Sequence, residues 1–140
     1  MAYKFERLEV WQLALEYTDL IYTIAEQLPC SEDFNLKSQI IRATTGVVLN
    51  IAEGSTSQSD AEQARFIGMA IRSLTEIVAC QHLINRRSYL KDSELLRNAY
   101  HFSEKLFAKL QAFRASLTTP SNLIVREEPD LYEYNDNTPF

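Results

Sequence analysis

The chain has 140 residues and a mass of 16.1 kDa, which is the size of one ordinary domain that can bury its own core. Its three glycines and four prolines are too few turn-forming residues for a sandwich or barrel of many short strands. The formal net charge of −5 argues against broad binding to a phosphate backbone, which needs clustered lysine and arginine side chains.

The first predicted helix carries small and apolar residues at three- and four-residue steps, which is the helical period. These residues are Trp11, Ala14, Leu15, Thr18, Ile21, Ala25 and Leu28. Pro29 ends the helix, and Cys30 to Asn35 form a polar connection. The second predicted helix repeats the pattern at Leu36, Ile40, Ala43, Val47 and Ile51. Gly54 is well placed to be its C-terminal cap.

The third predicted helix begins at a capping box, because Ser59 is followed three residues later by Glu62. Its core line is Phe66, Ala70, Ser73, Ile77, Cys80 and Ile84, and it ends near Arg87. Asp92 can cap the fourth predicted helix. Its core line is Leu95, Ala99, Phe102, Leu106, Leu110, Phe113 and Leu117, and Pro120 closes it.

Four long helices joined by short turns favour an all-α, up-down-up-down antiparallel four-helix bundle over residues 1–120. Residues 121–140 form an acidic C-terminal tail with a net charge of −4, which lacks helical periodicity. The tail is too apolar to be wholly solvated, since it also contains Leu123, Ile124, Val125, Leu131, Tyr132, Tyr134 and Phe140. We therefore expect part of it to pack in extended form on its own subunit or on a neighbour.

The apolar faces of the second and third helices are wider than a monomeric bundle requires. The second helix adds Ile41, Thr44 and Val48 beside its core line, and the third adds Ile67, Ile71, Leu74 and Val78. Burial against another subunit explains this width, and so does an internal core widened by large aromatic neighbours. The pattern favours a homo-oligomer.

The sequence offers no support for an enzyme. A di-iron site in a helical bundle needs Glu-x-x-His pairs, whereas Ala79 precedes His82 and Asn98 precedes His101 at that spacing. The cysteines, Cys30 and Cys80, are isolated, and no glycine-rich phosphate loop is present. We expect no catalytic residues, no metal and no cofactor.

One polar stripe on the second predicted helix invites a functional interpretation. Its members are Gln39, Arg42, Gly46, Asn50 and Glu53. A solvated face explains such a stripe, but Gly46 costs about 1 kcal/mol relative to alanine in the middle of a helix. Glycine at such a position is favoured where a neighbouring backbone packs closely. Ser73 lies on the buried line of the third helix, and its hydroxyl can bond either to its own helix or across to the Asn50 region.

A basic cluster, Arg86, Arg87 and Lys91, surrounds the turn between the third and fourth helices, with Tyr89 among them. Three cations and an aromatic ring could contact a nucleic-acid backbone and stack a base. Cations are also stabilising at a helix C-terminus, which accounts for Arg86 and Arg87 on structural grounds alone.

Several of these residues fall into a familiar order. Phe5, Leu8, Val10, Trp11 and Ala14 open a pattern that continues through Leu36, Gln39, Arg42 and Ala43. The string Asn50-Ile51-Ala52-Glu53-Gly54 follows, then Phe66, Ala70, Ser73, Glu76 and Tyr89-Leu90. Over residues 4–117 the chain resembles the four-helix bundle proteins encoded by intervening sequences of bacterial 23S ribosomal RNA. This resemblance implies a ring-like homopentamer without enzymatic activity, in which Gln39, Arg42, Asn50, Glu53, Gly54, Ser73 and Glu76 are motif or interface residues.

The same resemblance implies two functional hypotheses. The first is a non-enzymatic homo-oligomeric scaffold with weak nucleic-acid or partner-protein binding. The second follows from a similar fold, that of the accessory variability protein of diversity-generating retroelements, and is a nucleic-acid-binding subunit of a reverse transcriptase. RNA, DNA and a reverse transcriptase are therefore candidate partners. The charged N-terminus and the absence of a long apolar stretch predict a cytoplasmic protein without a membrane segment.

Overall fold

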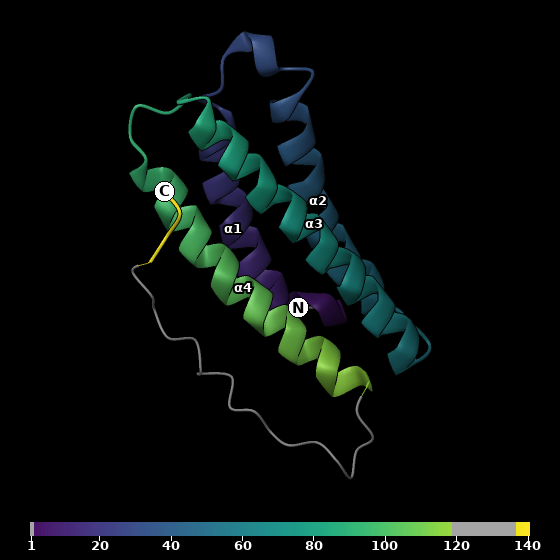
Figure 1. Cartoon of the computed structure of the whole chain (residues 1–140). Helices are drawn as coiled ribbons and strands as arrows, with labels where there is room; N and C mark the ends of the chain where they lie inside the picture. Colours follow the sequence, from purple (N-terminus) through teal and green to yellow (C-terminus); the bar gives the residue numbers. More distant parts are fainter. Residues whose placement is uncertain (1, 119–136) are drawn as a thin grey trace.

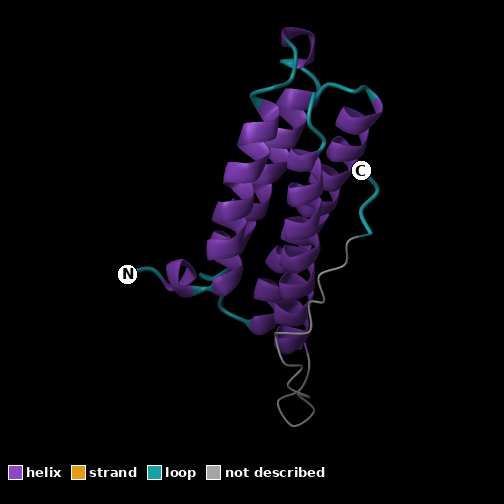
Figure 2. Ribbon diagram, turned by 90° about the vertical axis from the view of Figure 1, so that its left-hand side faces the viewer, coloured by secondary structure: helices purple, strands orange, loops and turns teal. Residues whose placement is uncertain are grey.

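The computed structural model describes residues 2–118 and 137–140. Within these residues the chain is all-α, as the sequence predicts, with no β-strand. Its elements are η1 (Lys4–Arg7), α1 (Glu9–Ala25), η2 (Cys30–Glu32), α2 (Leu36–Gly54), α3 (Asp60–Arg86) and α4 (Glu94–Thr118), where η denotes a short 3-10 helix. The four α-helices lie side by side in a bundle (Figures 1 and 2).

The helix starts that the sequence predicts are built by side-chain caps. Ser59 Oγ accepts a hydrogen bond of 3.2 Å from the Glu62 backbone N–H at the start of α3. The Glu62 carboxylate accepts from the N–H of Gln58 at 3.4 Å rather than from Ser59, so the capping box is shifted by one residue. Asp92 Oδ1 accepts from the N–H of Glu94 at 2.9 Å at the start of α4. The helix ends at Thr118, and Pro120 lies outside the described residues.

Each long helix packs against two others, and the four helices together surround one apolar core. α1 packs against α2 and α4, and α3 packs against the same two helices. The side chains of Tyr17, Ile21 and Ile24 from α1 are almost fully buried in this core. Leu15, which the sequence pattern places on the core line, is exposed instead, because the buried face of α1 centres on Tyr17.

The wide apolar faces of α2 and α3 are accounted for within the chain. Ile67, Ile71 and Leu74 are buried in the core of the single chain. Thr44 is buried too, and its hydroxyl donates a 2.7 Å hydrogen bond to the Ile40 carbonyl. Ile41, Val48 and Val78 are partly buried. The burial of these residues within one chain therefore agrees with an internal core that is wider than the sequence pattern requires. Any subunit interface must be formed by other side chains.

Gly54 is not the C-terminal cap that the sequence suggests. It is the last residue of α2, Ser55 follows it with a right-handed φ of −68°, and no glycine of the described residues has positive φ. Gly54 is instead a close-contact position, because a Cβ atom placed on it would lie 2.9 Å from the Cβ of Phe66. The absence of a side chain at residue 54 lets the end of α2 meet the beginning of α3.

This contact gives opposite expectations for two glycine substitutions. Gly54→Ala should lower the free energy of unfolding by about 1–3 kcal/mol, since the new methyl group overpacks against Phe66. Gly68→Ala should raise it by about 0.5–1 kcal/mol, since its Cβ would meet only the Arg114 guanidinium at 3.5 Å while the helix gains propensity. Urea unfolding at equal m-value measures both changes, and two changes of the same sign would contradict this account of Gly54.

Residues 137–140 at the C-terminus are not helical, and Phe140 packs against the core. The expectation that part of the tail packs on its own subunit is therefore met at Phe140. The rest of the predicted tail, residues 121–136, lies outside the described part of the chain.

Candidate functional site

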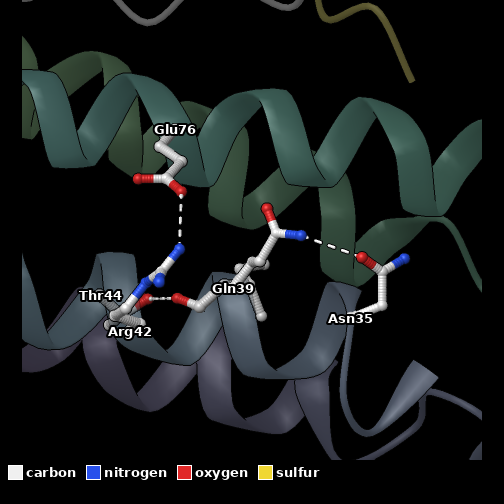
Figure 3. Close-up of polar contacts among 6 residues, drawn as sticks. Asn35, Gln39, Arg42, Thr44 and Glu76 are labelled. Atoms are coloured by element: carbon white, nitrogen blue, oxygen red, sulfur yellow. Dashed lines mark hydrogen bonds and ion pairs between the residues drawn. The ribbon is translucent and has the colours of Figure 1, made fainter.

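Some of the motif residues of α2 and α3 meet along the contact between these two helices, here called the α2–α3 seam. Arg42 Nη2 of α2 lies 3.8 Å from Glu76 Oε1 of α3, and the pair bridges the two helices (Figure 3). The Arg42 side chain is 75% exposed and the Glu76 side chain 44%. An ion pair this open to water contributes about 0–1 kcal/mol, so it adds little to the stability of the seam.

Gly46 lies further along the same seam and faces Ser73. A Cβ atom on Gly46 would lie 2.8 Å from Ser73 Oγ, so the missing side chain makes room for the hydroxyl of α3. Asn50 Nδ2 donates a 2.8 Å hydrogen bond to the Gly46 carbonyl, one turn earlier in its own helix. Ser73 therefore lies against α2 at Gly46, and a hydrogen bond from its hydroxyl to the Asn50 region stays a prediction.

The remaining motif residues of α2 do not join this contact. Gln39 is exposed and donates from Nε2 to Asn35 Oδ1 at 2.9 Å, at the beginning of the helix (Figure 3). Glu53 is exposed near the end of α2, where its carbonyl oxygen accepts from the Thr56 hydroxyl at 2.8 Å. The structure thus brings together Arg42 with Glu76 and Gly46 with Ser73, and leaves Gln39 and Glu53 at the two ends of the helix. A role of these residues at a subunit contact stays a prediction.

The predicted basic cluster is held by a well-defined turn after α3. The N–H of Tyr89 donates to the Ile84 carbonyl at 3.3 Å and that of Ser88 to the Asn85 carbonyl at 3.0 Å, which is the Schellman pattern. Ser88 takes the left-handed position of this motif, with φ of 55°, where glycine is usual. The turn leaves Arg86, Arg87 and Lys91 exposed at one end of the bundle.

Two further basic residues on α3 were missed by the sequence reasoning. Arg65 and Arg72 are exposed and seven residues apart, and Arg86 continues the same series after Ala79. Residues seven apart share one face of a helix, so a count of arginines at this spacing would have found them. Across residues 63–91 the chain has five lysine or arginine residues and one acidic residue, Glu76.

Sequence reasoning also missed a polar contact inside the core. Tyr17 of α1 and Gln81 of α3 are both buried, and Gln81 Nε2 donates to Tyr17 Oη at 3.0 Å. Burial raises the pKa of Tyr17 far above its ordinary value, and the hydrogen bond with Gln81 offsets part of this shift. Burial also raises the pKa of the Cys80 thiol beside them, and the Glu76 charge adds to that effect. Both groups therefore stay protonated at neutral pH.

No three His, Cys, Asp or Glu side chains lie together as a metal site in residues 2–118 and 137–140. No helix of the same residues is both long and apolar enough to span a membrane.

Four helices around one core, with a glycine-mediated seam between α2 and α3, define the class of protein as an all-α helical bundle. The chain belongs to the 23S rRNA-intervening sequence protein family, whose family model matches residues 6–112. The match spans the α2–α3 seam and the basic cluster, and it confirms the family resemblance seen in the sequence. A search of curated proteins finds no match to the chain.

The buried Tyr17 makes the stability of the fold depend on alkaline pH. Above about pH 10 the unfolded chain ionises this phenol while the folded chain keeps it protonated, so folding stability present below pH 10 is lost as the pH rises. The loss from this residue should approach about 1.4 kcal/mol per pH unit. Tyr17→Phe should remove this slope, and should also cost about 1–3 kcal/mol at neutral pH because Gln81 loses its partner.

Urea unfolding between pH 9 and 11.5 measures the effect, with Tyr22→Phe as the control because Tyr22 is exposed. Equal slopes for the two variants would show that Tyr17 does not set the alkaline dependence.

Proposed function

We propose that the protein is a non-enzymatic cytoplasmic scaffold, an up-down-up-down antiparallel bundle that assembles into a homo-oligomer. The family match supports a protein of the 23S rRNA-intervening sequence type, and the resemblance of its motifs favours a ring of five copies. A cyclic ring uses heterologous contacts, in which one face of each subunit meets a different face of its neighbour. The proposal therefore requires two exposed surfaces with side chains that can be buried.

The order of contacts along each helix supports the antiparallel topology. Moving eight residues back along α2 moves seven residues forward along α3, and the α1–α4 and α3–α4 pairs reverse in the same way. For α2 with α3 the contacts are Gly54–Phe66 and Gly46–Ser73, and for α1 with α4 they are Glu9–Lys109 and Tyr17–Phe102. For α3 with α4 the first contact is Gly68–Arg114. Further along α3, His82 contacts the Phe140 ring, which is also contacted by Tyr100 of α4.

The observation that carries the oligomer is apolar surface outside the core. Leu15 and Tyr22 are exposed and lie seven residues apart, on one face of α1. Leu49 of α2 is 51% exposed and lies outside the face of this helix that packs in the core. Single exposed leucines are common, but large side chains at helical spacing outside the core are typical of a contact surface.

Sedimentation analysis tests the scaffold. The wild-type chain should sediment as an oligomer at micromolar concentration. Leu15→Glu should weaken assembly at least about tenfold, because it puts a charge where the proposed subunit contact would bury the exposed Leu15. Gln111→Glu on the exposed side of α4 adds the same charge and should have no effect. A wild-type species of 16.1 kDa would rule out the scaffold, whereas a dimer or tetramer would refute only the count of five.

The second candidate is a nucleic-acid-binding accessory subunit of a retroelement reverse transcriptase. The series of exposed arginines on α3 is the observation that favours it. No acidic side chain among the described residues pairs with Arg65, Arg72, Arg86 or Arg87. Arg65 and Arg86 are separated by 21 residues of helix, or about 32 Å, so the arginine face extends along most of α3, with the exposed Glu62 and Glu76 on the same helix. Such a face suits a phosphate backbone better than a single small anion.

An electrophoretic shift with structured RNA at several salt concentrations tests this candidate. Replacement of Arg86 and Arg87 by alanine should weaken binding and reduce the magnitude of the slope of log affinity against log salt by about two. Lys4→Ala with Arg7→Ala removes the same charge at the other end of the bundle and serves as the control. Equal slopes for both double variants, or no shift at low salt, would reject the nucleic-acid candidate.

A further inference from the structure

Helices α3 and α4 contact each other at two places that lie far apart along the bundle. At the first, the Arg114 guanidinium of α4 lies over Gly68 of α3, since its Cζ atom is 3.5 Å from the point that a Cβ atom on Gly68 would occupy. At the second, His82 of α3 and Tyr100 of α4 both contact the Phe140 ring. Figure 1 shows the two helices side by side. The exposed surface of α3 and α4 between these two contacts is here called the α3–α4 face.

The two contacts fix which residues of α3 and α4 lie level with each other. His82 follows Gly68 by fourteen residues on α3, and Tyr100 precedes Arg114 by fourteen residues on α4. Equal numbers of residues span equal lengths of α-helix, at 1.5 Å per residue. Phe107, midway between Tyr100 and Arg114, therefore lies about 10 Å along the bundle from each contact.

Phe107 is an aromatic side chain that stays open at the middle of the α3–α4 face. Tyr100, Phe107 and Arg114 are seven residues apart and so share one side of α4. The Phe107 side chain is 41% exposed, and its ring packs on no other aromatic ring of residues 2–118 and 137–140. Phe107 therefore offers apolar ring surface between the place that Phe140 occupies and the Arg114 guanidinium.

Two exposed cations lie on the side of Phe107 that is away from Phe140. Arg72 follows Gly68 by four residues on α3, so it lies at a level between Arg114 and Phe107. Arg72 and Arg114 are both exposed, and neither guanidinium forms an ion pair with a carboxylate in the described part of the chain. This part of the face therefore carries an excess of positive charge.

The carboxylates nearest to this surface in the sequence are paired with other groups. Glu76 follows Arg72 by one turn, but its Oε1 atom lies 3.8 Å from Arg42 Nη2 on the α2–α3 seam. Glu104 Oε1 of α4 lies 3.6 Å from His101 Nδ1. An anionic ligand would therefore meet the two arginines without displacing a carboxylate from them.

We propose that the α3–α4 face binds single-stranded nucleic acid, with one base stacked on Phe107 and backbone phosphates on Arg72 and Arg114. Aromatic side chains that stack bases, combined with cations along the backbone, are the usual means of binding a single strand without sequence preference. A duplex keeps its bases stacked on one another, so an exposed ring selects unpaired nucleotides. This use of the face rests on the second proposed function, and it goes further by naming the substrate class and a contact surface that includes α4.

Phe34 is the competing aromatic residue, because it is fully exposed in the connection between α1 and α2. Glu32 and Asp33 directly precede it, and their carboxylates repel a phosphate backbone. Lys37 lies 3.9 Å from Asp33 and offsets only one of these two charges. The difference in local charge favours Phe107 and makes Phe34 a matched control.

Fluorescence anisotropy with a labelled single strand tests the site. A mixed-sequence oligonucleotide of about twelve nucleotides without self-complementarity should bind the full-length chain at low salt. Phe107→Leu should weaken this binding about tenfold, because the stacked base loses its ring. Phe34→Leu makes the same chemical change and should leave binding unchanged. Equal effects of the two substitutions, or a larger effect at Phe34, would overturn the assignment to Phe107.

A measurement on the wild-type chain removes any dependence on how the Phe107→Leu variant folds. The ring protons of Phe107 should move upfield in the NMR spectrum as the same oligonucleotide is added, because they come to lie in the ring current of a stacked base. The ring protons of Phe34 should stay in place. Resonances of Phe107 that do not move at saturation with the strand would contradict stacking on this ring.

The two arginines are tested by the salt dependence of single-strand binding. Arg72→Gln with Arg114→Gln should reduce the magnitude of the slope of log affinity against log salt by about 1.4, or about 0.7 for each lost phosphate contact. Lys4→Gln with Arg7→Gln removes the same charge outside the α3–α4 face and should leave the slope unchanged. Equal slopes for the two double variants would overturn the phosphate contacts.

Comparison with structured RNA separates failure of this site from failure of the second proposed function. A wild-type chain that shifts structured RNA but leaves the single strand unbound would overturn single-strand binding and retain the second function. The same conclusion follows where the single strand binds and neither Phe107→Leu nor the Arg72 and Arg114 variant weakens it. Binding of neither nucleic acid at low salt would reject both.

Discussion

The close approach of α2 to α3 is the constraint on which the motif surface depends. At Gly54 and at Gly46 the missing side chain lets a residue of α3 come within a distance that a Cβ atom does not tolerate. Helix axes that approach this closely bring polar side chains on their outer edges within reach, as Arg42 and Glu76 show. The ion pair is too exposed to hold the helices together by itself, so it follows from the packing and does not cause it.

This order of cause explains why the sequence predicted the elements better than the site. Helices α3 and α4 begin at the caps formed by Ser59 and Asp92. These caps could be predicted because each is a local interaction between residues two or three apart in the sequence. The class of fold follows from apolar periodicity in the same local way. Gly54 was misjudged, because its role is set by Phe66, whose contact with it depends on how two helices pack.

The same limit applies to burial. A periodic pattern tells which residues share a face, but the width of the buried face depends on how many neighbours the helix has. Ile71 and Leu74 face the core because α3 lies between α2 and α4. Leu15 is exposed although it fits the period of α1, because the larger Tyr17 sets the centre of that buried face. No local rule distinguishes these two cases.

Charge shows a comparable difference between the whole chain and its parts. The net charge of −5 is an average over an acidic tail and a stretch, residues 63–91, that holds five basic residues and one acidic residue. Arg65, Arg72 and Arg86 share one face of α3 because of their seven-residue spacing, which is independent of the total charge. An argument from net charge alone therefore undervalues the nucleic-acid candidate, because a partner meets the local potential of one face.

The buried pair Tyr17 and Gln81 adds a constraint that apolar packing does not supply. α1 and α3 lie across the core from each other, and this hydrogen bond joins them through it. Apolar contacts are non-directional, so on their own they tolerate a small shift of one helix along another better than a hydrogen bond does. A buried amide does not tolerate such a shift, because it would leave Gln81 without its partner in an apolar interior. The pair therefore fixes the register of α1 against α3, and with it the position of Glu76 on the α2–α3 seam and of His82 under Phe140, since both lie within five residues of Gln81 on the same helix.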